Sequence, residues 1–129
     1  MLVVGGPEFK EIADLFFQCK PNKVATTYSS KNAEMLKYGL NTFFTTKVIF
    51  ANDLYDICQQ ECCDYEFVKN VMYKHKWVGS NHLDVMHGGF RGAGGKCLKK
   101  DTNAIVAKYK TDLLRKVNEI NTKLLGEKK

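Results

Sequence analysis

The chain has 129 residues, of which 44% are hydrophobic and 12% aromatic, and this composition excludes an intrinsically disordered protein. The formal net charge of +6 is compatible with nucleic-acid binding, with nucleotide phosphates or with solubility alone. No apolar run approaches the roughly 18 residues of a membrane-spanning helix. The five cysteines are an odd number without the spacing of a disulfide framework: Cys19, Cys58, Cys62, Cys63 and Cys97. We therefore expect one domain, or a piece of a larger enzyme, with reduced thiols in the cytoplasm.

The first 28 residues predict a strand, a helix and a second strand. Residues 2–4 are a short apolar run stopped by two glycines, and residues 7–17 have apolar side chains at helical spacing. Residues 24–28 are rich in β-branched side chains, which favour a strand. Such a β-α-β segment is too small to form a stable sheet alone.

The strongest predicted element is a helix from about residue 32 to 60, roughly 28 residues and so about 42 Å long. A helix of this length needs a packing partner along much of its face. We expect that face to be its apolar stripe, which consists of Leu36, Leu40, Phe43, Phe44, Phe50, Leu54, Ile57 and Cys58.

The second half of the chain predicts two further helices separated by a long irregular segment. Residues 64–74 have a short helical pattern, and residues 75–96 are rich in glycine and have the character of a loop. Long loops in compact domains are often functional. A single last helix is predicted over residues 101–125, ending at Gly126.

The end of that loop is the stretch most typical of chemistry. Residues 92–101 read Gly-Ala-Gly-Gly-Lys-Cys-Leu-Lys-Lys-Asp, and the helical pattern that follows places Cys97 at or just inside a helix N-terminus. The helix dipole and three neighbouring lysines favour the thiolate form of such a cysteine. Cys97, with Asp101 one helical turn further on, is therefore a candidate covalent nucleophile. The alternative is a glycine loop that precedes a half-buried structural cysteine.

Two motifs in the right order carry a resemblance to a known family. Lys37 and Asn41 share a face of the long helix, a pairing that is usually only a solvated surface. The residues around them resemble the central-domain helix of the UDP-glucose/GDP-mannose 6-dehydrogenase family, namely Ala33-Glu34-Met35-Leu36-Lys37-Tyr38, Asn41, Phe43, Thr46-Lys47-Val48 and Asn52-Asp53. Residues 94–101 resemble that family's G-G-S-C-F-P-K-D signature. Residues 3–6 are similar to a strand end late in its nucleotide-binding domain, and residues 113–121 to the helix leading into its C-terminal domain.

This resemblance implies a mainly α fold, related to the UDP-glucose dehydrogenase dimerisation domain and to the C-terminal domain of 6-phosphogluconate dehydrogenase. Residues 1–28 would be the remnant end of a nucleotide-binding domain, preceding a helical central domain over residues 29–129. The family pairs two subunits through this domain, so the exposed side of the 32–60 helix is expected to form a homodimer.

The resemblance also implies an activity, the NAD-dependent two-step oxidation of a nucleotide-sugar C6 alcohol to the carboxylate. Cys97 would form a thiohemiacetal and then a thioester with the substrate. Lys37 and Asn41 would stabilise the oxyanion, and Asp101 would position or activate water.

Cofactor and substrate contacts follow from the same signature. Lys100 would contact the NAD pyrophosphate, and the backbone of Gly94 and Gly95 would contact the sugar. The sequence departs from the family at four positions, Asp53, Ala93, Lys96 and Lys99. It also contains no N-terminal dinucleotide-binding fingerprint. We therefore expect the chain to be inactive alone and to use NAD only with an NAD-binding domain supplied by a partner chain.

Three alternatives stay open. The chain could be a dimerising structural module with vestigial site residues, or a basic nucleic-acid-binding module that uses residues 96–100 and Arg91. Aromatic side chains do not interleave with these basic residues, so nucleic acid is not the expected partner. A metal site is the third alternative, although the spacing matches no compact zinc pattern; its candidate ligands are Cys58, Cys62, Cys63, His75, His82 and His87. We expect the cysteines near the end of the long helix to be buried instead.

Overall fold

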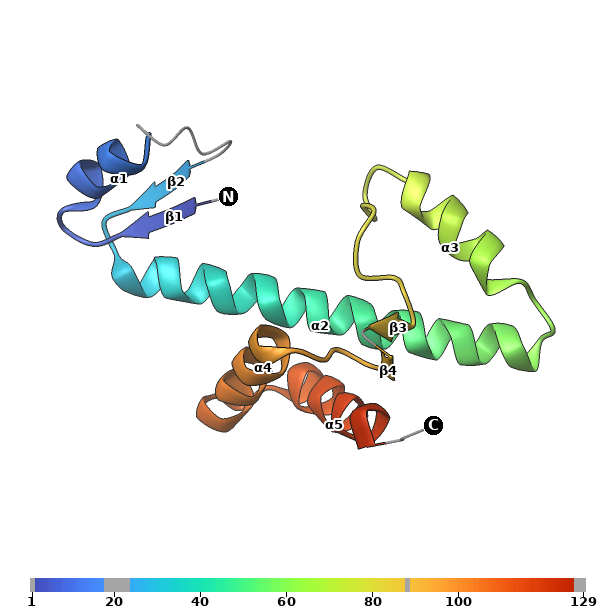
Figure 1. Cartoon of the computed structure of the whole chain (residues 1–129). Helices are drawn as coiled ribbons and strands as arrows, with labels where there is room; N and C mark the ends of the chain where they lie inside the picture. The colour runs from blue at the N-terminus through green and yellow to red at the C-terminus, as the bar shows by residue number, and fades with distance from the viewer. Residues whose placement is uncertain (1, 18–23, 88, 127–129) are drawn as a thin grey trace. The chain divides into compact units, whose positions relative to one another are not determined.

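A computed structural model describes residues 2–17, 24–87 and 89–126 (Figure 1). The elements are mainly helical, which confirms the expected fold class, and they run β1 (Leu2–Gly5), α1 (Phe9–Phe17), β2 (Val24–Thr27), α2 (Ser30–Gln60), α3 (Tyr65–Lys74), β3 (Met86–His87), β4 (Phe90–Arg91), α4 (Lys96–Lys108) and α5 (Asp112–Gly126). The chain divides into two compact units, Met1–Leu40 and Asn41–Lys129. The domain boundary expected at residue 28 concerns the origin of the segments, not their compactness, so it stays a prediction.

The first unit contains the expected strand-helix-strand segment. Strands β1 and β2 pair in parallel, with Val4 opposite Thr26, and the buried side chains of Val4, Phe9 and Ala13 form a small core. Helix α1 begins at Phe9, two residues later than predicted, because the chain first makes a turn in which the Phe9 N–H donates to the Gly6 carbonyl. At Gly5 an added Cβ would lie 2.6 Å from the Cβ of Ala33, so the close approach of α2 requires glycine there.

The long helix α2 is confirmed, but its predicted buried stripe is largely wrong. Phe43, Phe50 and Ile57 are 58%, 50% and 54% exposed. The buried residues of α2 are mostly small or polar: Thr42, Thr45, Val48, Ile49, Ala51, Asn52 and Cys58. Such side chains allow close helix packing, and the Thr102 hydroxyl of α4 donates to the Thr45 hydroxyl at 3.0 Å.

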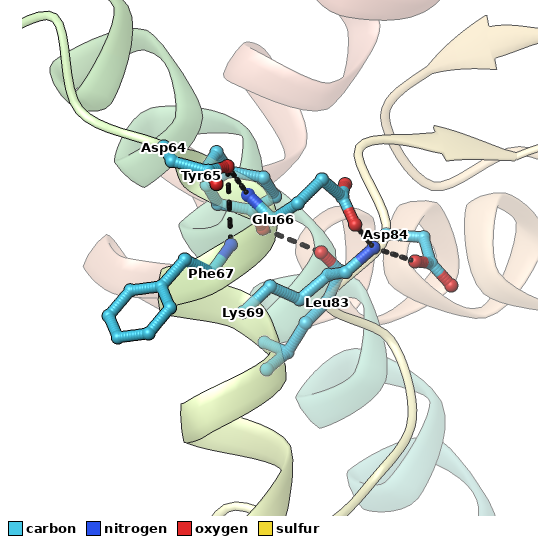
Figure 2. A network of polar contacts seen from close by, with 7 residues as sticks. All are labelled: Asp64, Tyr65, Glu66, Phe67, Lys69, Leu83 and Asp84. Atoms are coloured by element: carbon cyan, nitrogen blue, oxygen red, sulfur yellow. Dashed lines mark hydrogen bonds and ion pairs between the residues drawn. The ribbon is translucent and has the colours of Figure 1, made fainter.

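Helix α3 is confirmed close to its predicted bounds. An N-cap residue and a network of polar contacts stabilise the helix (Figure 2). The Asp64 carboxylate accepts hydrogen bonds from the backbone N–H groups of Glu66 and Phe67, as expected of an N-cap aspartate. The buried Tyr65 hydroxyl donates to the Leu83 carbonyl at 2.6 Å, which ties the helix to the following loop. Burial raises the pKa of Tyr65 to about 12, against the opposing charge of Lys69.

The segment after α3 contains more regular structure than the sequence predicted. Strands β3 and β4, each two residues long, pair in antiparallel orientation inside the expected loop. The single last helix is also wrong, because Tyr109 adopts an extended conformation and separates α4 from α5. The apolar periodicity continues across the break, while Thr111-Asp112 is the kind of helix-start signal that marks the second helix.

The cysteines near the end of α2 differ from one another. Cys58 is buried as expected, but Cys62 and Cys63 are exposed because the helix ends at Gln60, before them. Cys62 adopts a positive φ of 55° in the turn that leads to α3. Cys19 lies outside the described residues.

Candidate functional site

The candidate nucleophile lies in the first turn of α4. The helix begins at Lys96, so the prediction that Cys97 lies just inside a helix N-terminus is confirmed, and its side chain is exposed. Gly95 occupies the N-cap position with a φ of 81° and provides no side-chain hydrogen bond to the first turn. Three exposed lysines surround this end of the helix, namely Lys96, Lys99 and Lys100. Cys97 therefore lies at a helix N-terminus, in a segment that carries three exposed cations.

One turn further along α4, Asp101 is buried, with a relative exposure of 1%. The Asn41 side-chain amide of α2 donates to its Oδ2 atom at 2.6 Å. The Lys100 ammonium lies 3.6 Å from its Oδ1 atom and is itself largely exposed. Two of the predicted site residues, 60 positions apart in the sequence, are thus in direct contact within the second unit.

The glycine loop before Cys97 is held by residues that the sequence reasoning missed. The side-chain amide of Asn121 on α5 pairs with both backbone groups of Ala93, at 2.7 Å to the N–H and 3.2 Å to the carbonyl. At the start of the loop, the Arg91 guanidinium donates to the Asn52 side-chain oxygen at 2.9 Å and to the Asp56 carboxylate at 2.7 Å. The available signal was an asparagine within each apolar helix face, where a buried amide requires partners.

Lys37 and Gly94 are two further predicted site residues. Lys37 lies on the part of α2 that belongs to the first unit, exposed, with its ammonium 5.6 Å from the centroid of the Tyr38 ring. Gly94 is half-buried, and an added Cβ would lie 3.8 Å from the Cδ2 atom of Leu125. The oxyanion and sugar-binding roles given to Lys37 and Gly94 stay predictions.

The rival sites gain no support from the geometry. Among residues 2–17, 24–87 and 89–126, no three His, Cys, Asp or Glu side chains converge where they could hold a metal ion. Arg91 is committed to Asn52 and Asp56, so it does not extend an exposed basic row. Within the same described ranges, no helix combines the length and the apolar character needed to cross a membrane.

A sequence profile for the central domain of the UDP-glucose/GDP-mannose dehydrogenase family matches residues 31–123. The chain belongs to this family. It is 38% identical over 96 residues to UDP-glucose 6-dehydrogenase YwqF of Bacillus subtilis (strain 168), an alignment that covers 70% of this chain and 21% of YwqF. The corresponding values are 35% over 98 residues for TuaD of the same organism, with 72% and 20% covered. For AglM of Haloferax volcanii they are 36% over 94 residues, with 69% and 21% covered.

The matched region includes the residues of the candidate site. It contains both the α2 motif with Asn41 and the α4 motif with Cys97 and Asp101. The chain spans about a fifth of the length of these relatives.

Proposed function

We propose that this chain is the catalytic-cysteine portion of a nucleotide-sugar 6-dehydrogenase that oxidises the C6 alcohol of a UDP-sugar to the carboxylate. The observation that carries this proposal is the 2.6 Å hydrogen bond between Asn41 and Asp101. It joins the two family motifs, with an exposed Cys97 one helical turn from Asp101.

The chemistry assigned to Cys97 is addition to the aldehyde formed in the first oxidation. Its sulfur forms a bond to the aldehyde carbon, and the carbonyl oxygen becomes negatively charged. Loss of a hydride from that carbon leaves a thioester, and attack by water then breaks the carbon–sulfur bond and releases the acid and the thiol. NAD supplies the hydride acceptor for each oxidation.

Asn41 and Asp101 act in this proposal as an oriented pair. The Asn41 amide nitrogen carries two hydrogens, and the bond to Asp101 uses one of them and fixes the plane of the amide. The second hydrogen can then be directed at the developing oxyanion. Donors that are already oriented stabilise such charge without reorganising during the reaction.

The described residues fit part of an NAD site. Lys100 is exposed beside the α4 N-terminus and fits a contact to a phosphate. Among the residues that the structure describes in the first unit, the parallel sheet consists of the two strands β1 and β2, whereas a dinucleotide is held across a crevice of a larger sheet. We therefore assign the main NAD contacts to another part of the enzyme or to a partner chain.

Assembly as a homodimer is also part of the proposal. Phe43, Phe50 and Ile57 follow one another at intervals of seven residues along α2 and so lie on one side of it. All three are at least half exposed, and apolar rows of this kind on a long helix favour pairing with a second helix. A second copy of α2 is the partner that we propose.

The test is competitive alkylation of the purified chain with limiting iodoacetamide at neutral pH, measured by peptide mass spectrometry. Cys62 and Cys63 are exposed and lie away from the α4 N-terminus, so they serve as references within the same molecule. We expect Cys97 to react fastest because it is exposed in the first turn of α4, where the helix N-terminus and the neighbouring lysines attract an anionic sulfur. Equal rates for Cys97, Cys62 and Cys63 would contradict the catalytic assignment.

A further inference from the structure

The glycine loop that leads to Cys97 is fastened to α5 by one buried side chain. Asn121 is 1% exposed, its oxygen accepts from the Ala93 N–H at 2.7 Å, and its amide nitrogen donates to the Ala93 carbonyl at 3.2 Å. The side chain thus pairs with the backbone as a neighbouring strand would. Because both bonds are buried, losing them would leave the Ala93 N–H and carbonyl without compensation.

The loop is shaped to accept this side chain. Gly92 has a φ of 87°, and an added Cβ there would lie 2.8 Å from the Asn121 oxygen and 3.1 Å from the Cβ of Leu124. Leu124 in turn packs with Val117 and Ile49 in the core between α5 and α2. The position of the loop is therefore coupled to the core of the second unit.

A second attachment holds the other end of the loop. Asn52 is fully buried, and its side-chain oxygen accepts from the Arg91 guanidinium while its amide nitrogen donates to the Val48 carbonyl of α2. Arg91 is therefore held against α2 and Ala93 against α5. Only three residues, Gly94 to Lys96, separate this anchored segment from Cys97.

We propose that Asn121 is a positioning residue for Cys97. By holding Ala93 it sets where the chain enters α4, and hence where the thiol stands relative to the helix N-terminus, to the lysines around it and to the Asn41–Asp101 pair. This inference rests on the proposed function, which gives Cys97 its chemical role. Asn121 itself is buried and acts only through the loop.

The experiment compares an anionic and a neutral alkylating reagent on the full chain. Iodoacetate is an anion and iodoacetamide is neutral, so the ratio of their rates at Cys97 reports the positive potential around the thiol. Each rate is divided by the rate at Cys62 and Cys63 of the same molecule, which removes reagent differences. We expect the native chain to show a preference for iodoacetate at Cys97 of about fivefold, the effect of one nearby unit charge in water.

Asn121→Leu keeps the number and branching of the side-chain heavy atoms and removes both hydrogen bonds, and we expect it to abolish most of this preference. The matched control is Val117→Ala, a buried position one turn earlier on α5 that packs with Ile49 and Leu124. This variant weakens the same helix packing and should keep the preference. Should Asn121→Leu fail to fold, Asn121→Ala removes both hydrogen bonds to Ala93 without adding a charge, and it should also lose most of the preference.

An unchanged preference in the Asn121 variants would overturn the positioning role and leave the proposed function intact. An equal loss in Val117→Ala would also overturn it, because general packing would then be the cause. A native chain in which Cys97 behaves like Cys62 with both reagents would refute the proposed function and this inference together.

Discussion

Replacement of Gly92 by alanine should destabilise the second unit through two separate effects. The backbone φ of 87° strains any side chain, at a cost of about 1–2 kcal/mol. In addition, the new Cβ would lie 2.8 Å from the Asn121 oxygen, so Asn121 must move away from Ala93. Disturbing those two buried hydrogen bonds adds about 1 kcal/mol each, and more if their groups stay unpaired. We expect a total loss of about 3–5 kcal/mol in the free energy of unfolding.

Gly79→Ala is the matched control, since Gly79 also has a positive φ, of 73°, but an added Cβ there meets nothing within 4 Å. Only the backbone strain remains, so this variant should lose about 1–2 kcal/mol. The free energy of unfolding of both variants is measured by urea unfolding, followed by circular dichroism and by the fluorescence of Trp77. This single tryptophan lies in the second unit. Equal losses in the two variants would refute the role of Asn121 in shaping the loop.

Three further predictions concern stability, cofactor and assembly. Tyr65→Phe should lose about 1–2 kcal/mol at neutral pH, because the Leu83 carbonyl loses its buried partner. The raised pKa of Tyr65, about 12 in the folded chain, means that its contribution is complete below pH 10 and is lost as the pH rises towards 12. The decline in unfolding free energy over that interval should therefore be smaller in Tyr65→Phe than in the native chain, and identical pH profiles would contradict the assignment. NAD should bind the purified chain no better than millimolar in calorimetry, and micromolar binding would show that the dinucleotide site lies within these residues. Light scattering at tens of micromolar should give about twice the chain mass of 14.7 kDa, and a clean monomer would exclude the α2 homodimer.

The local structure could largely be predicted from the sequence. The apolar spacing of residues 32–60 predicted α2, and the helical pattern of residues 64–74 predicted α3. The glycines before Lys96 predicted a helix N-terminus at Cys97, although the last helical pattern was placed from residue 101 and α4 begins at Lys96. The two motifs around Asn41 and Cys97 also identified the family, which the profile match over residues 31–123 confirms. These features depend on residues within a turn or two of each other, so the local spacing of apolar, glycine and polar residues is enough to predict them.

The buried face of α2 and the construction of the site were decided only by the tertiary structure. Hydrophobic spacing favoured Phe43 and Phe50 as core residues, yet the packed face uses Thr45 because its hydroxyl meets Thr102 across a close helix contact. Asn121 likewise has an unremarkable place in a helical pattern until its amide is seen to pair with Ala93. Contacts between residues far apart in the sequence depend on which surfaces pack together and which partners satisfy the buried polar groups. The local hydrophobic periodicity does not predict these contacts, because it reflects only the residues near each position in the sequence.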